Sequence, residues 1–262
     1  MSAKVRLEDA GSGVRVIRLA DPDRRNAIGH AMRDELAAAA GDVANDANAR
    51  ALVIRADGPS FCAGADVVET FGGLADLPVE AVRDELMRIY ESFLKVRALE
   101  IPTIAAIRGN AIGAGLNLAL CCDLRLAAPD ASFGATFARI GLHPGGGCSY
   151  FLASALGPQR AMRVLLDGAT LDARAAAAGG LVDEIVDDPE SAALEIAARW
   201  ARLDTKLARN IKKSLRLAVE KGFDAVLEFE SWAQAETARG PGIQQVVAQR
   251  RDKEGSKKGA VA

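Results

Sequence analysis

The sequence is poor in the features that identify several classes of protein directly. Its four cysteines, two of them adjacent, have the spacing of neither a zinc site nor a disulfide framework. A formal net charge of −2 gives no electrostatic basis for nucleic-acid binding. No apolar run is long enough to cross a bilayer, and residues 1–11 lack the apolar stretch of a signal peptide. We therefore expect a reduced, cytoplasmic protein that uses no metal, nucleic acid or membrane.

What is present is enough material for a large core. The chain has 262 residues, of which 50% are hydrophobic and 26% charged, which suits one sizeable globular unit with or without a small appendage. Val5 to Leu19 alternates around two glycines and predicts a β-hairpin. Ala51 to Ala56 predicts a buried strand, and Met32 to Ala44 and Val79 to Arg97 predict helices. Strand and helix keep alternating to Val186, which indicates an α/β fold with parallel strands and right-handed connections.

The pattern changes after Pro189, where only helices are predicted. Apolar residues recur at helical spacing in Ser191 to Leu203, Thr205 to Lys221 and Ala225 to Thr237. We therefore predict two domains, a core at residues 1–190 and a helical C-terminal lobe with its tail at residues 191–262.

The chain is organised around residues 101–123, IPTIAAIRGNAIGAGLNLALCCD. A β-branched apolar run predicts a buried strand, and Gly113-Ala114-Gly115 then leads into a helix that is apolar nearly all round. The unpaired N–H groups and the positive dipole end of such a helix favour an oxyanion in front of Ala114. The alternative is a glycine-rich turn that serves close packing only. The glycine spacing fits neither a dinucleotide fingerprint nor a P-loop, so nucleotide phosphate is not the expected guest.

A second motif makes the pattern specific. Residues 52–55 predict another buried strand, which runs into Ser60-Phe-Cys-Ala-Gly-Ala-Asp66. This motif, followed by IPTIAAIRGNAIGAG, resembles the crotonase (enoyl-CoA hydratase/isomerase) superfamily. DPDRRNAI at residues 21–28 and FARIGLHPGGG at residues 137–147 extend the resemblance over essentially the whole chain.

The resemblance implies a fold, an assembly and a ligand. The fold would be α/β, a crotonase-like spiral of βα turns followed by a helical C-terminal trimerisation lobe. Such proteins assemble as homotrimers or dimers of trimers. The ligand would be an acyl-CoA thioester, with coenzyme A as part of the substrate and no other cofactor.

The resemblance also assigns roles to residues. The backbone N–H groups of Ala65 and Ala114 would form an oxyanion hole for the thioester oxygen. Segment 68–82 would line the acyl pocket. The loop before residue 28 would wrap the adenine and pantetheine of coenzyme A, although from its composition alone it is a solvated surface connection. The positions implied in substrate binding are Arg25, Asn26, Ala27, Ala63, Gly64, Asp66 and Gly113.

The acid–base groups are where the sequence departs from the family. Hydratases carry two glutamates, and the corresponding positions here are Asn117 and Phe137, neither of which transfers protons. The aspartate that other members use corresponds to Gly145. His143 and Asp66 remain nearby as candidates. A histidine before a proline is more often a structural hydrogen-bond partner, and Asp66 is better placed to cap the segment that follows it.

These observations predict an acyl-CoA-binding protein of the enoyl-CoA hydratase/isomerase family, working in fatty-acid or related acyl-CoA metabolism. Three alternatives stay open. One is a catalytically silent acyl-CoA-binding protein, and another is a non-hydratase crotonase that uses His143 or Asp66. The third is an RNA-associated member of the same fold, which would need a basic face that the net charge does not indicate.

Overall fold

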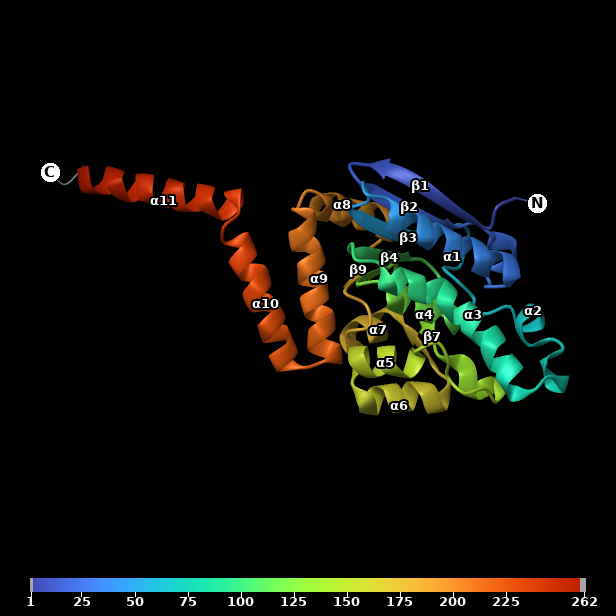
Figure 1. Cartoon of the computed structure of the whole chain (residues 1–262). Helices are drawn as coiled ribbons and strands as arrows, with labels where there is room; N and C mark the ends of the chain where they lie inside the picture. The colour runs from blue at the N-terminus through green and yellow to red at the C-terminus, as the bar shows by residue number, and fades with distance from the viewer. Residues whose placement is uncertain (1, 260–262) are drawn as a thin grey trace. The chain divides into compact units, whose positions relative to one another are not determined.

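The computed structural model describes residues 2–259 (Figure 1) and divides into two compact units, the first ending at Leu203 and the second beginning at Asp204. The predicted boundary at 190/191 is therefore too early. Helix α8 (Pro189–Ala201) buries Ala193 and Ala197 in one apolar cluster with Val53 and Ile104 of the sheet. The first helix after residue 190 thus completes the core of the first unit.

The first unit is built on a six-stranded sheet in the order β1-β2-β3-β4-β6-β9. Its strands are β1 (Val5–Gly11), β2 (Val14–Leu19), β3 (Ala51–Ala56), β4 (Thr103–Ile107), β6 (Leu124–Ala127) and β9 (Glu184–Ile185). β1 and β2 form the predicted antiparallel hairpin, and every other pair is parallel. The α/β class and the parallel arrangement predicted from the sequence are confirmed.

Both faces of this sheet are buried, and side chains alternate between them. In β3, Leu52 and Ile54 join the larger apolar cluster, whereas Val53 joins the cluster under α8. The larger cluster is covered by α1 (His30–Asn45), which packs against α3 (Val79–Ala98). A parallel sheet covered on both faces is the arrangement that the uninterrupted apolar strands of the sequence indicate.

A second, three-stranded sheet was not predicted as such. It consists of β5 (Asn110–Ile112), β7 (Ser132–Gly134) and β8 (Thr170–Asp172). A three-residue strand is too short for a periodic pattern, so the sequence indicates only a turn at residues 109–110. β5 leads directly into α4 (Ala114–Cys121), all eight residues of which are buried. The prediction that this apolar helix lies inside the protein is confirmed.

The remaining elements connect these layers. In the first unit they are the short helices η1 (Pro22–Arg24), α2 (Val67–Phe71), η2 (Leu74–Asp76) and η3 (Thr136–Ile140), and the helices α5 (Cys148–Leu156), α6 (Pro158–Asp167) and α7 (Ala173–Gly179). The second unit contains α9 (Thr205–Glu220), α10 (Phe223–Thr237) and α11 (Pro241–Gly259). In the part of the chain that the structure describes, no helix has the length and hydropathy needed to span a membrane.

The second unit is helical, as predicted. Within it α9 and α10 pack against each other, with the Lys213 ammonium 4.5 Å from the centre of the Phe229 ring. No described residue of α10 is buried, and its Phe223, Leu227 and Trp232 are exposed.

Gly115 permits the close packing of α4, and this leads to a stability prediction. A Cβ at Gly115 would lie 2.6 Å from the Cβ of Cys62 and overlap the Cys62 carbonyl oxygen. We expect Gly115→Ala to lower the free energy of unfolding by about 1–3 kcal/mol, the usual cost of overpacking a core. Urea denaturation measures this difference.

The matched control is Gly41→Ala in α1, where an added Cβ meets no atom within 4 Å. Removing a helical glycine there should stabilise the protein by about 0.5–1 kcal/mol. Equal effects of the two substitutions would contradict the close contact between α4 and Cys62.

Candidate active site

The centre of the candidate site is the place where residues 62–66 run beside β5 and the start of α4. The Cys62 N–H donates to the Asn110 carbonyl at 2.9 Å, and the Ile112 N–H donates to the Cys62 carbonyl at 3.0 Å. A Cβ on Gly64 would lie 2.8 Å from the Ile112 oxygen and 3.6 Å from the Ala114 nitrogen. With φ at +101°, this position suits glycine. The two segments are therefore in backbone contact just before Ala65 and Ala114.

The N–H groups of Ala65 and Ala114 have no acceptor in the described part of the chain. Residue 65 forms a parallel bridge with Ile28, in which Ile28 donates to the Gly64 oxygen and accepts from the Asp66 nitrogen. The bridge therefore leaves the Ala65 N–H on the opposite side of its strand. Ala114 is the first residue of α4, where a helical N–H has no intrahelical partner.

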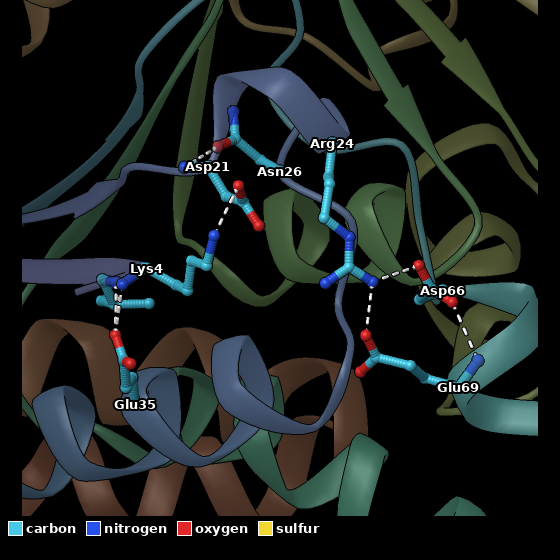
Figure 2. A network of polar contacts seen from close by, with 8 residues as sticks. Lys4, Asp21, Arg24, Asn26, Glu35, Asp66 and Glu69 are labelled. Atoms are coloured by element: carbon cyan, nitrogen blue, oxygen red, sulfur yellow. Dashed lines mark hydrogen bonds and ion pairs between the residues drawn. The ribbon is translucent and has the colours of Figure 1, made fainter. Parts of the chain in front are cut away.

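The loop at residues 21–27 is held by a buried asparagine (Figure 2). Asn26 is fully buried; its Oδ1 accepts from the Asp21 N–H at 2.8 Å, and its Nδ2 donates to the carbonyls of Asp57 and Ser60, each at 2.9 Å. The Asp21 carboxylate is itself paired with the Lys4 ammonium at 2.8 Å. Asn26 thus ties the loop to the chain that precedes the Cys62 segment.

The same loop contacts the Cys62–Asp66 segment through its backbone. The Ala63 N–H donates to the Arg25 carbonyl at 3.0 Å. Arg25 and Asn26 have positive φ angles of 52° and 54°, a conformation that non-glycine residues adopt only at a cost. The side-chain bonds of Asn26 hold the loop in this shape.

A cavity of about 290 Å³ lies beside both segments, residues 62–66 and the start of α4. Ala65 and Ala114 belong to its wall, which is otherwise mainly apolar. Five of its lining residues have polar side chains, namely Thr70, Tyr90, Asn117, Thr136 and His143. None of the lining residues in the described part of the chain is an Asp, Glu, Lys, Arg or Cys. The described wall of the cavity therefore holds no carboxylate, ammonium, guanidinium or thiol group.

Asn117 and Phe137, at the positions of the family glutamates, both line this cavity. Asn117 is 1% exposed, and its Nδ2 donates to the Gly145 carbonyl at 2.9 Å. Its Oδ1 is buried and has no hydrogen-bond partner in the described structure. Phe137 packs against the main core, and its ring is 3.9 Å from where a Cβ of Gly113 would lie.

His143 is exposed and lines the cavity. Its Nδ1 lies 2.8 Å from the Pro144 oxygen. Because a carbonyl oxygen only accepts, Nδ1 is the donor in this hydrogen bond.

Asp66 does not line the cavity in the described structure. Its Oδ1 accepts from the Glu69 N–H at 2.9 Å, so it caps α2 as predicted.

Sequence reasoning missed Tyr90, which lies on α3 within a pattern that indicates only an amphipathic helix. Its ring is half-buried at the cavity wall, and a Cβ added to Gly145 would lie 2.8 Å from its Cζ and overlap its hydroxyl. Burial raises the pKa of Tyr90 above its ordinary value, so the phenol keeps its proton at neutral pH.

An ion-pair network fastens the wall formed by α2 (Figure 2). Arg24 Nη2 donates to Asp66 Oδ2 at 2.5 Å and to Glu69 Oε1 at 2.6 Å, and Glu69 Oε2 accepts from the His30 N–H at 2.8 Å. The pKa of Asp66 is lowered mainly by the hydrogen bond from the Glu69 N–H and next by the one from Arg24. The pKa of Glu69 is also lowered, mainly by the hydrogen bond from the His30 N–H and next by the one from Arg24. The network joins α2, which supplies Thr70 to the cavity, to η1 and to the start of α1.

No group of three His, Cys, Asp or Glu side chains within residues 2–259 has an arrangement that could hold a metal ion. The four cysteines are free and buried. Burial raises the pKa of the Cys62 and Cys148 thiols to about 12, so neither forms a thiolate at neutral pH.

Comparison with known proteins agrees with the fold and with the motifs. A family model described as enoyl-CoA hydratase/isomerase matches residues 9–252. "Probable enoyl-CoA hydratase EchA14" of Mycobacterium tuberculosis is 43% identical over 209 residues, which are 80% of each chain. A methylglutaconyl-CoA hydratase of mouse mitochondria is 30% identical over 224 residues, covering 84% of this chain and 70% of that protein.

The same similarity is found among solved structures. The crystal structure of an enoyl-CoA hydratase from Bacillus anthracis superposes with a TM-score of 0.85 at 28% identity. The superposition covers 95% of this chain and 96% of that one.

The network around Arg24 predicts a pH-dependent contribution to stability. Because the pKa of Asp66 is lowered in the folded state, its contribution is present above the unfolded pKa of about 4 and is lost as pH falls through the folded value. Asp66→Asn keeps a capping oxygen but removes the charge. We expect it to cost about 0.5–1 kcal/mol at pH 7, and progressively less below about pH 4. Urea denaturation at several pH values measures this.

Asp84→Asn is the control, because among the described residues Asp84 pairs with Arg83 alone and both side chains are 70% exposed. It should change stability by less than about 0.5 kcal/mol at every pH. A cost of Asp66→Asn that did not depend on pH would show that the ion pair contributes nothing.

Proposed function

Because this chain belongs to the enoyl-CoA hydratase/isomerase family, we propose that it binds an acyl-CoA thioester and polarises the thioester carbonyl. The acyl group would occupy the cavity of about 290 Å³, and the carbonyl oxygen would lie between the N–H groups of Ala65 and Ala114. The loop at Arg25, Asn26 and Ala27 would hold the coenzyme A moiety. The observation that carries the proposal is a mainly apolar cavity lined by Ala65 and Ala114, whose N–H groups have no acceptor among the described residues and whose segments are in contact.

The two donors would act on charge that develops on the carbonyl oxygen. Loss of one such donor typically costs about 3 kcal/mol of transition-state stabilisation. Backbone donors need no particular side chain, so alanine at both positions is compatible with this role. The positive end of the α4 dipole, at Ala114, would also stabilise negative charge on this oxygen.

We propose that hydration is not the main activity of this protein. Hydration needs a base to take a proton from water and an acid to protonate the acyl carbon. The amide of Asn117 has no useful basicity near neutral pH, and Phe137 puts an apolar ring at the second position. No carboxylate among the described residues replaces them at the cavity wall.

Two more specific functions remain, and one side chain separates them. A silent acyl-CoA-binding protein needs no proton-transfer group, whereas a non-hydratase enzyme would use His143, which lines the cavity and has its Nδ1 against the Pro144 oxygen. Asp66 is the weaker candidate because it is engaged by Arg24 and by the cap of α2. Absence of turnover with a panel of acyl-CoA thioesters would select the silent protein. Turnover that is abolished by His143→Gln would select the enzyme.

We also propose a homotrimer or a dimer of trimers in the cytoplasm, working in fatty-acid or related acyl-CoA metabolism. Large apolar side chains are exposed on α9 and α10, as on surfaces that a partner covers. They are Ile211, Leu215, Val219, Phe223, Leu227 and Trp232. Four free, buried cysteines fit a reducing compartment. A monomeric mass by light scattering would contradict the assembly.

The role of Ala65 is tested by Ala65→Pro, which removes an N–H that lacks an acceptor among the described residues and restricts the backbone at residue 65. The bridge to Ile28 uses the Gly64 oxygen and the Asp66 nitrogen, so we expect the fold to survive. Affinity for butyryl-CoA, or turnover if it is found, should fall at least about tenfold. Ala65→Ser keeps the N–H and is the control. Unchanged binding and turnover in the proline variant would remove Ala65 from the site.

The absence of carboxylates is tested with crotonyl-CoA. We expect hydration far below about 10 s⁻¹, the rate of an average enzyme, and an increase when both carboxylates are restored by Asn117→Glu with Phe137→Glu. A positioned acid–base group is typically worth about 10²–10⁴-fold. The measurement is loss of enoyl thioester absorbance, with each single variant as a control. Thermal unfolding is followed in parallel, because a buried charge also costs stability.

Wild-type hydration at about 10 s⁻¹ or more would contradict the proposal that hydration is lost. Another group would then transfer the proton, and His143 would be the first to replace.

A further inference from the structure

The wall that α2 gives to the cavity has little apolar packing to hold it in place. Helix α2 has five residues, of which only Thr70 is buried, and its Val68 is 80% exposed. Gly72 and Gly73 follow it directly, and a Cβ added to Gly73 would meet no atom within 4 Å. Short elements with few buried apolar side chains open easily in folded proteins. The position of α2, which supplies Thr70 and Phe71 to the cavity, therefore depends on polar contacts.

Glu69 of α2 supplies the cap that helix α1 does not have from its own sequence. The residue before α1 is Gly29, which has no side chain and makes no side-chain cap hydrogen bond. Glu69 Oε2 accepts from the His30 N–H at 2.8 Å instead, at the end of α1 where the helix dipole favours a negative charge. Glu69 Oε1 accepts from Arg24 Nη2 at 2.6 Å (Figure 2). Both carboxylate oxygens thus bind groups outside α2, and they join α2 to α1 and to η1.

Gly29 leaves the space in which this carboxylate lies. A Cβ at residue 29 would overlap Glu69 Oε2 and lie 2.8 Å from Glu69 Cδ. The backbone of Gly29, with φ −92° and ψ −171°, is in the extended region that other residues also adopt. The backbone conformation therefore does not require glycine at residue 29, whereas the close approach of Glu69 does.

We infer that Glu69 is a positioning residue, which holds the α2 wall against α1 and so limits the size of the acyl group that the cavity accepts. The inference rests on the proposed function, because it places an acyl group in the cavity. An acyl chain that exceeds the cavity of about 290 Å³ displaces α2, and the bonds from His30 and Arg24 to Glu69 oppose that displacement. A short chain leaves these bonds intact. Long chains alone therefore bear the cost of breaking them.

The test compares butyryl-CoA with the longer decanoyl-CoA by calorimetric titration of the full-length protein. Glu69→Gln removes the charge and leaves only one of the two oxygens as an acceptor. Hydrogen bonds to a charged group typically change an equilibrium by about tenfold or more. We expect the affinity for decanoyl-CoA, relative to that for butyryl-CoA, to rise about tenfold in this variant.

Gly29→Ala tests the same contact from the other side, because the new methyl group takes the space of the carboxylate while α2 keeps its sequence. It should raise the same affinity ratio at least about threefold. Gly41→Ala is the matched control in the same helix, where an added Cβ meets no atom within 4 Å. Glu91→Gln is the control for loss of charge, because Glu91 is exposed on α3 and does not line the cavity in the described structure. Both controls should leave the ratio within about twofold of wild type.

Hydrogen exchange of the ligand-free protein measures the α2 wall directly. The N–H groups of Thr70 and Gly72 are hydrogen-bonded at this helix, Thr70 to the Asp66 carbonyl at 2.8 Å. Their exchange should accelerate about tenfold in Glu69→Gln, while exchange within α4 stays unchanged. A general loss of stability would instead accelerate exchange in both helices.

An affinity ratio that is unchanged in both Glu69→Gln and Gly29→Ala would overturn the inference and leave the proposed function intact, since both thioesters would still bind. Unchanged exchange of the α2 amides in Glu69→Gln would also overturn it. If Gly29→Ala does not fold, Glu69→Gln and the exchange rates decide. If neither thioester binds the wild-type protein, the proposed function fails, and the inference fails with it.

Discussion

The site depends on one backbone contact, between the Cys62–Asp66 segment and the β5–α4 connection. Hydrogen bonds between Cys62 and the two ends of β5 fix the register, and Gly115 lets the first turn of α4 approach the Cys62 carbonyl. The N–H groups of Ala65 and Ala114 come from residues 49 positions apart in the sequence, and this contact brings their segments together. A shift of one residue would turn one N–H away from the cavity.

The surrounding structure keeps this contact rigid by different means on its two sides. On one side α4 is completely buried, so its position is set by packing with the apolar core. On the other side Asn26 and the Arg24–Asp66–Glu69 network hold an irregular loop and a short helix through polar bonds. Arg24 is about two-fifths exposed, and surface ion pairs are weak. The α2 wall is therefore the less stable of the two.

The chemistry that the cavity can support follows from the charged groups that its wall lacks. With no Asp, Glu, Lys or Arg among the described lining residues, charge on a bound acyl group would be stabilised mainly by backbone N–H groups and helix α4. The polar side chains that remain are those of Thr70, Tyr90, Asn117, Thr136 and His143. Such groups orient and recognise a ligand more readily than they move protons, with His143 as the exception.

The sequence by itself determined the layers of the fold and the identity of the central motifs. Strands such as residues 51–56 and the apolar helix after Gly113 follow from local patterns, and the substitutions Asn117 and Phe137 are visible by position alone. Tertiary structure decided the rest. The three-residue strand β5 has no periodicity of its own, and the place of α8 in the core depends on which surface its alanines meet. Tyr90 reaches Gly145 only through the packing of α3, because contacts between distant segments leave no local signal in the sequence.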